Sequence, residues 1–141
     1  MRLQNLPSPY YRVALKALIF DDQNRLLIAI NEDNLAELPG GGWEYDDLDI
    51  EAGMQRELQE EIGVLIRTIS PVLFVFRGVS AKRGVHAVRF VMRVQPDSYD
   101  FTPGDDIIGT KFVTPAEFTA LDWDSSDAGI VDFVDQIWPA S

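Results

Sequence analysis

Residues 49–63 constrain the fold of this chain most strongly, because they predict an amphipathic helix that carries a dense group of acids. We expect the helix to run from about Asp49 to Ile62. Asp49 can cap its first turn, and Gly63 can adopt the left-handed conformation that ends a helix. At about 100° per residue, the apolar side chains fall on one stripe that is expected to face the core. Its members are Ile50, Met54, Leu58 and Ile62.

Three carboxylates, those of Glu57, Glu60 and Glu61, lie within five residues of this helix. Charges on a helix usually mark its solvated face, but Glu61 falls about 40° and Glu57 about 80° from the centre of the apolar stripe. Free carboxylates are costly there, and two of them one turn apart repel each other. Mg²⁺ would resolve this crowding, since it binds one or two carboxylates together with substrate phosphates. Arg56 is expected to contact Glu60 and to point away from the other two acids.

Apolar runs typical of strands flank the helix on both sides. They are residues 12–20, 25–30, 64–76, 85–94 and 107–113. The turn-forming residues 21–24 join the first two runs, so we expect a hairpin there. Residues 31–37 are polar and predict a loop, and Pro71 predicts a bend or a sheet edge.

The C-terminal part of the sequence predicts two helices. Residues 114–117 have the form of a capping box with a proline at the first helical position. A closing helix is expected from Ser125 or Ser126, with one apolar face formed by Ile130, Val134, Ile137 and Trp138. The order β-β-α-β-β-β-α-α predicts an α/β (α+β) protein, in which helices flank a mixed sheet. We expect residues 1–141 to form a single domain.

Composition excludes several classes of function. The sequence has 23 acidic and 12 basic side chains, a net charge of -11 that opposes general binding to nucleic acid. It has no cysteine for a thiolate site, and its single histidine, His86, argues against a Ser-His-Asp triad. No apolar run is long enough to span a membrane. Residues 1–9 lack the apolar core of a signal peptide, so a cytoplasmic protein is expected.

The acidic helix and the glycines before it resemble the signature of the Nudix hydrolases. Residues 56–64 (RELQEEIGV) match the second half of that signature, G-x5-E-x7-R-E-U-x-E-E-x-G-U, at every fixed position; U is a bulky aliphatic residue. Residues 38–42 (LPGGG) are similar to the Leu-Pro-Gly-Gly run common in the family. The predicted element order also resembles the family's layout. The resemblance implies a Nudix-type α/β/α sandwich, with the signature at about residues 41–64.

The first half of the signature departs from the family pattern. Counted back from Arg56, the leading glycine is Gly42 and the glutamate position holds Leu48. Counted forward from Gly41, the glutamate position holds Asp47, with one residue inserted before Arg56. We prefer the second register because Asp47 keeps a carboxylate.

The resemblance implies a pyrophosphohydrolase that depends on Mg²⁺, with Mn²⁺ as the alternative cation. Such enzymes cleave a nucleoside diphosphate linked to another moiety by water attack on phosphorus. The implied metal site is Glu57, Glu60, Glu61 and Gly41. The implied catalytic residues are Glu57, Glu60, Arg56 and Asp106. Which acid is the base stays open, and Asp106, like the adjacent Asp105, is equally compatible with a solvated loop.

The expected partner is a small nucleotide-type molecule, with no nucleic acid and no membrane, bound by a monomer or a homodimer. Candidate substrate-binding residues are Gly42, Trp43, Arg12 and Lys16. A (d)NTP or another small nucleotide derivative is the favoured substrate. The alternative is a Nudix-like module without catalytic activity that binds a nucleotide or a nucleotide sugar.

Overall fold

The computed structural model describes residues 10–139. The expectation about a signal peptide concerns residues 1–9 and lies outside the described residues. That residues 1–141 form one domain stays a prediction. Within residues 10–139, every helix is too short or too polar to cross a membrane.

Helix α1 (Ile50–Ile62) forms where the sequence predicts it. The Asp49 side chain accepts a hydrogen bond from the Ala52 N–H at 2.8 Å, and Gly63 ends the helix with φ of 71°. Met54, Leu58 and Ile62 are fully buried, as the apolar stripe requires. They pack with Leu15 and other side chains of the strands, so this face anchors α1 to the sheet.

The strands form two sheets. The larger sheet has the order β4-β1-β7-β5, and β6 also pairs with β7. Its strands are β1 (Arg12–Leu18), β4 (Gly40–Gly42), β5 (Ile66–Ile69), β6 (Phe74–Ser80) and β7 (Val85–Pro96). The smaller sheet has the order β3-β2-β8. Its strands are β2 (Leu26–Asn31), β3 (Ala36–Glu37) and β8 (Ile107–Val113).

The first two strands pair as the expected hairpin only next to the turn that joins them. The turn at Asp21 joins β1 to β2, and Phe20 pairs with Leu26 in an isolated bridge. Beyond it the strands diverge: β1 runs parallel to β7, whereas β2 pairs with β8. The polar stretch predicted as a loop contains the short strand β3. The single predicted strand of residues 64–76 is divided at Pro71 into β5 and β6, both antiparallel to β7.

The C-terminal part contains short helices. Helix α2 (Pro115–Thr119) has the predicted capping box, with reciprocal hydrogen bonds between Thr114 and Glu117. The expected closing helix is instead a 3₁₀ helix, η2 (Ala128–Phe133), followed by one turn of α-helix, α3 (Val134–Ile137). Ile130 and Ile137 from this expected face are buried.

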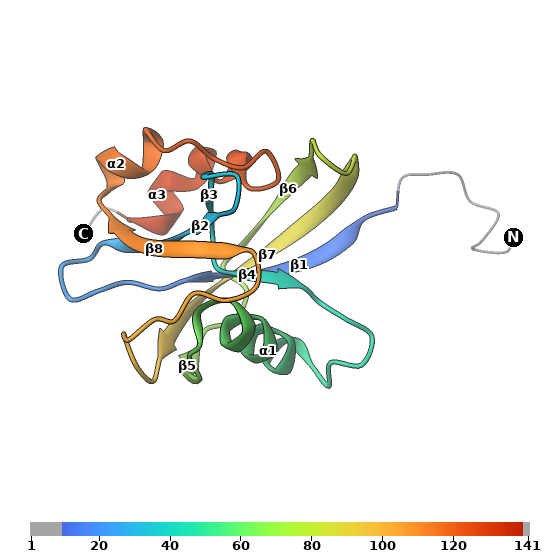
Figure 1. Cartoon of the computed structure of the whole chain (residues 1–141), viewed down its shortest axis with the longest axis horizontal. Coiled ribbons are helices and arrows are strands. Elements are labelled where there is room, and N and C mark those ends of the chain that lie inside the picture. The colour runs from blue at the N-terminus through green and yellow to red at the C-terminus, as the bar shows by residue number, and fades with distance from the viewer. Residues whose placement is uncertain (1–9, 140–141) are drawn as a thin grey trace, which may run out of the picture.

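The strands lie between α1 on one side and the C-terminal helices on the other (Figure 1). One apolar cluster packs α1 against β1 and β7, and a second packs the C-terminal helices against the sheets. This layering confirms the predicted mixed α+β class. It also places the glycine strand β4 beside both α1 and β1.

Candidate functional site

The three glycines form strand β4, which is antiparallel to β1. Gly40 has φ of +132°, a conformation that L side chains rarely adopt. A Cβ atom at Gly40 would overlap the backbone carbonyl of Leu15, and one at Gly41 would overlap the carboxylate of Glu57. The missing side chains therefore let β4 lie close to β1 and let a carboxylate of α1 reach the β4 backbone.

Replacing Gly40 with alanine should destabilise the protein by about 1–3 kcal/mol, because the new side chain combines a strained φ with a backbone collision. Urea unfolding followed by circular dichroism measures the effect. The control is Gly109→Ala, since a Cβ there meets nothing within 4 Å. Equal stability of the two variants would show that the packing of β4 does not require this glycine.

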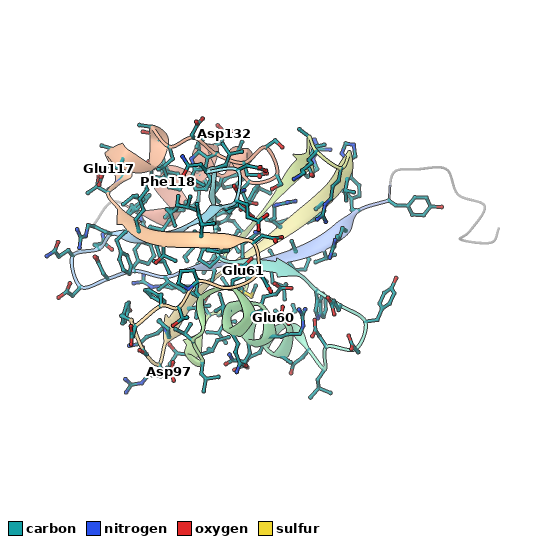
Figure 2. The ribbon with its side chains drawn as sticks, in the orientation of Figure 1. Glu60, Glu61, Asp97, Glu117, Phe118 and Asp132 are labelled. Carbon is teal, nitrogen blue, oxygen red and sulfur yellow. The ribbon has the colours of Figure 1, made fainter. Side chains whose placement is uncertain are left out.

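Glu61 extends from the last turn of α1 to this strand. Its Oε1 atom accepts a hydrogen bond from the Gly40 N–H at 2.8 Å. Burial raises the pKa of Glu61 to about 8, although Lys16 and the Gly40 N–H both favour the charged form. Figure 2 shows Glu61 between α1 and the strands, with Glu60 further out on the helix. A half-buried carboxylate whose pKa stays raised despite Lys16 is suited to binding a further cation.

Glu57 lies one turn before Glu61 and packs against Gly41. Its side chain is 13% exposed, and burial raises its pKa, opposed by a hydrogen bond from Arg56. That bond joins Arg56 Nη1 to Glu57 Oε1 at 2.8 Å. The expectation that Arg56 points away from Glu57 is therefore wrong. The guanidinium bonds Glu57 of α1 and, at the same time, acceptors at Asp47 and Gly42 before the helix.

The main partner of Arg56 is Asp47. Arg56 Nε and Nη2 donate to the two carboxylate oxygens of Asp47 at 2.9 Å each, and Nη2 also donates to the Gly42 carbonyl at 2.9 Å. These hydrogen bonds lower the pKa of Asp47 to about 2. Leu48 is 92% exposed and takes no part. The geometry thus agrees with the register in which Asp47 holds the acidic position, and it makes Asp47 the residue that fixes Arg56.

Two of the expected site residues lie further out. Glu60 has a side chain that is 46% exposed and lies 3.5 Å from Arg56 Nη1. Asp106 is exposed, and its side chain has no hydrogen bond or ion pair to any other residue in the range 10–139. Its loop nevertheless abuts the end of α1, where the Gly104 N–H donates to the Glu61 carbonyl at 2.8 Å.

The expected substrate-binding residues have different environments. The Lys16 side chain is buried; its Nζ atom lies 3.3 Å from Asp127 and 3.9 Å from Glu37. Burial lowers the pKa of Lys16, but these carboxylates outweigh it and raise the pKa above its ordinary value. Arg12 is exposed, and its guanidinium lies against Gly42 without a carboxylate partner among residues 10–139. Trp43 is 38% exposed.

Sequence reasoning missed the buried polar network beside Lys16. Asp127 is fully buried, and its carboxylate accepts from the Leu38 N–H and from Arg89 Nε, at 2.9 Å each. Asn31 donates to Glu37 and to a further carboxylate, that of Asp124. In the sequence these residues are isolated polar positions. The one available signal was the position of Lys16 inside an apolar strand, where a charge needs a partner.

The acids suit a hard cation, although residues 10–139 contain no group of three or more potential ligands that is already arranged around one point. Two carboxylates, Glu57 and Glu61, are held against the backbone of β4, and burial raises the pKa of each. A divalent cation would offset their charge. Mg²⁺ commonly takes one or two carboxylates and completes its octahedron with water and phosphate oxygens. The donor set therefore fits Mg²⁺ or Mn²⁺.

Without a divalent cation, the free energy of unfolding should fall as the pH rises from about 4.5 to 8. Glu61 has a folded-state pKa of about 8, above its ordinary value of 4.5, so the folded protein retains a proton that the unfolded chain releases. The expected loss is at most about 1.4 kcal/mol per pH unit for this group. Burial raises the pKa of Glu37 and Glu57 in the same direction.

Urea unfolding at several pH values in the presence of a chelator measures this slope. Glu61→Gln should flatten it, and added Mg²⁺ should stabilise the unsubstituted protein most at pH 8. Identical slopes for the two proteins would show that Glu61 ionises normally in the fold.

A family model described as NUDIX domain matches residues 10–133. No match was found among curated proteins. Among solved structures, the chain is similar to a MutT protein from Methanosarcina mazei Go1, with a TM-score of 0.77 and 19% identity over 94% of this chain and 96% of that one. It also resembles the NUDIX domain of Shewanella oneidensis NrtR in complex with ADP ribose (TM-score 0.69, 16% identity, 92% of each chain). A third similar structure is an ADP-ribose pyrophosphatase from Streptococcus suis 89-1591 (TM-score 0.65, 18% identity, 94% and 95%).

Proposed function

Because this chain belongs to the Nudix family, we propose that it is a Mg²⁺-dependent pyrophosphohydrolase. Its reaction is the cleavage of a pyrophosphate bond in a nucleoside diphosphate linked to another moiety, by water attack on phosphorus. The observation that carries this proposal is the pair of half-buried carboxylates, Glu57 and Glu61, held against the backbone of β4. Phosphoryl transfer requires charge neutralisation and alignment more than covalent help from the protein, which such a pair supplies through a cation.

In this proposal Glu60, Glu61 and Gly41 hold Mg²⁺ or Mn²⁺, and Glu57 is a further ligand or the base. The cation offsets the charge of the substrate phosphates. Arg56 acts as a positioning residue, because its hydrogen bonds tie Glu57 to the loop through Asp47. Glu57 either binds the cation directly or takes the proton of the attacking water; Glu60 and Asp106 are the other candidate bases.

The environments of the basic residues refine the substrate-binding proposal. Lys16 forms ion pairs with Asp127 and Glu37, so it is a weaker candidate for binding phosphate than the sequence suggests. Arg12 is exposed beside Gly42 and has no carboxylate partner within residues 10–139, which favours it as the phosphate-binding side chain. Trp43 follows Gly42 and is available to stack on a base. A (d)NTP or small nucleotide derivative remains the favoured substrate. ADP-ribose is a further candidate, because two of the similar structures are described by it, one as a complex and one as a pyrophosphatase.

The rival proposal is a binding module without catalytic activity. Its support in the sequence is the altered first half of the signature, and the bound ADP ribose in the NrtR domain adds to it. Against it, Asp47 makes a two-point ion pair with Arg56 despite the altered spacing. Arg56 of the acidic helix is therefore fixed to the preceding loop, which favours the enzyme over the binding module.

Incubation with Mg²⁺ and a substrate panel tests the proposal. The panel contains nucleoside triphosphates, nucleotide sugars, ADP-ribose and dinucleoside polyphosphates, and phosphate is measured after a coupling phosphatase. We expect Mg²⁺-dependent turnover of at least one class, lost in Glu61→Gln while circular dichroism shows the fold retained. Metal-dependent nucleotide binding without turnover of any member would overturn the proposal in favour of the binding module.

A further inference from the structure

An acidic loop with two exposed apolar side chains joins β4 to α1. We define the acidic loop as residues 44–51, which include the first two residues of α1; it contains five acids and no lysine or arginine. Tyr45 is 110% exposed and Leu48 is 92% exposed, so neither contributes to the core. Both side chains are therefore accessible to another molecule.

A basic hairpin, formed by β6 and β7, has the opposite charge. The sequence contains no acid from Ser70 to Pro96, although the chain as a whole has 23. Val75 and Val79 are 45% and 41% exposed and alternate along β6 with the exposed Arg77. Lys82 and Arg83 lie in the turn between the two strands. The hairpin therefore presents apolar and cationic side chains together, as the acidic loop presents apolar and anionic ones.

The two surfaces extend from the same end of the molecule but do not join each other. Both border β1: the Trp43 N–H at the start of the loop donates to Val13, and β7 pairs with β1 from Arg12 onward. Figure 1 shows the loop after β4 and the β6–β7 hairpin both reaching toward the end from which β1 starts. Between residues 10 and 139, no hydrogen bond or ion pair links the loop to the hairpin. Some of the charges are paired within the chain: Glu44 and Asp47 pair with Arg56, and Lys82 Nζ lies 3.7 Å from Asp33. Within residues 10–139, Asp46 and Glu51 of the loop and Arg83 of the hairpin make no ion pair and can face another molecule.

We propose that the protein forms a two-fold symmetric dimer, in which the acidic loop of each copy docks on the basic hairpin of the other. Each copy carries both surfaces, so one two-fold axis satisfies both contacts and closes the assembly. The complementary charges set the register, while Tyr45 and Leu48 bury apolar area against the exposed valines of β6. The net charge of -11 opposes this association weakly, because repulsion beyond about 8 Å is screened at physiological salt.

Two charge-reversed variants test the pairing. The loop variant carries Asp46→Lys and Glu51→Lys, and the hairpin variant carries Lys82→Glu and Arg83→Glu. All four positions are exposed and lie outside the proposed catalytic machinery. The matched control, Asp22→Lys with Asp135→Lys, changes the net charge as the loop variant does, at exposed positions in other segments.

Sedimentation equilibrium should show a dimer for the unsubstituted protein and the control. Each reversed variant should raise the dimer dissociation constant by about tenfold or more, and Leu48→Ser should also raise it. An equimolar mixture of the two reversed variants should restore the dimer, because every loop then meets a hairpin of opposite charge. A monomeric unsubstituted protein at all concentrations would overturn the proposal. So would reversed variants that dimerise normally, or a mixture of folded variants that stays monomeric.

Discussion

Glu57→Gln should lower kcat by about 10²–10⁴-fold, with the fold retained. Glutamine keeps an oxygen that can accept the hydrogen bond now made by Arg56 to Glu57. It removes the charge, and with it either a ligand for the cation or the acceptor of the proton from water. Steady-state kinetics with the best substrate of the panel measures the effect, which should fall on kcat more than on KM.

The control for this substitution is Glu51→Gln. Glu51 is an exposed acid in the first turn of the same helix, and within residues 10–139 its side chain makes no hydrogen bond or ion pair. Its replacement should leave kcat within about twofold, since surface charges contribute little. If Glu57→Gln retains the activity of this control, Glu57 is not part of the catalytic machinery.

Asp127→Ala should destabilise the protein by about 3–5 kcal/mol, the usual cost of removing one partner of a buried ion pair. Asp127 is fully buried and faces two buried cations, Lys16 at 3.3 Å and Arg89 at 2.9 Å. Without it these cations lose their closest carboxylate, and the Leu38 N–H loses its acceptor. Arg89 Nη1 has no hydrogen-bond partner among residues 10–139, so the substitution would leave a second buried donor of Arg89 unpaired.

Urea unfolding at constant pH measures this difference. Asp127 immediately precedes the 3₁₀ helix η2. Asp132→Ala is the control, because Asp132 is exposed on that helix. It should change the free energy of unfolding by less than about 0.5 kcal/mol. A similarly small effect of Asp127→Ala would show that the buried network does not hold η2 to the sheet.

Local patterns in the sequence were sufficient to predict α1. Its cap at Asp49, its buried stripe and its end at Gly63 depend on residues within one or two turns of each other, so the pattern contains the information. The angular position of Glu57 and Glu61 beside that stripe agrees with their burial against β4.

Contacts between distant segments could not be predicted in this way. The separation of β1 from β2 into two sheets depends on pairing with β7 and β8, which the turn between them does not specify. The ion pair of Lys16 and Asp127 joins residues that are far apart in the sequence, and neither residue type alone predicts it. Arg56 contacts Glu57 because a loop residue, Asp47, binds the other side of its guanidinium. A helix considered alone does not contain that acceptor.

The most direct test of the central claim is hydrolysis in water enriched in ¹⁸O. The substrate is the member of the panel with the highest Mg²⁺-dependent turnover, and the masses of the products are measured by mass spectrometry. The proposed function predicts one ¹⁸O atom in one phosphate-containing product of each cleavage, and none when Mg²⁺ is omitted or Glu61 is replaced by glutamine. Products without ¹⁸O, or nucleotide binding with no cleavage of any panel member, would contradict it.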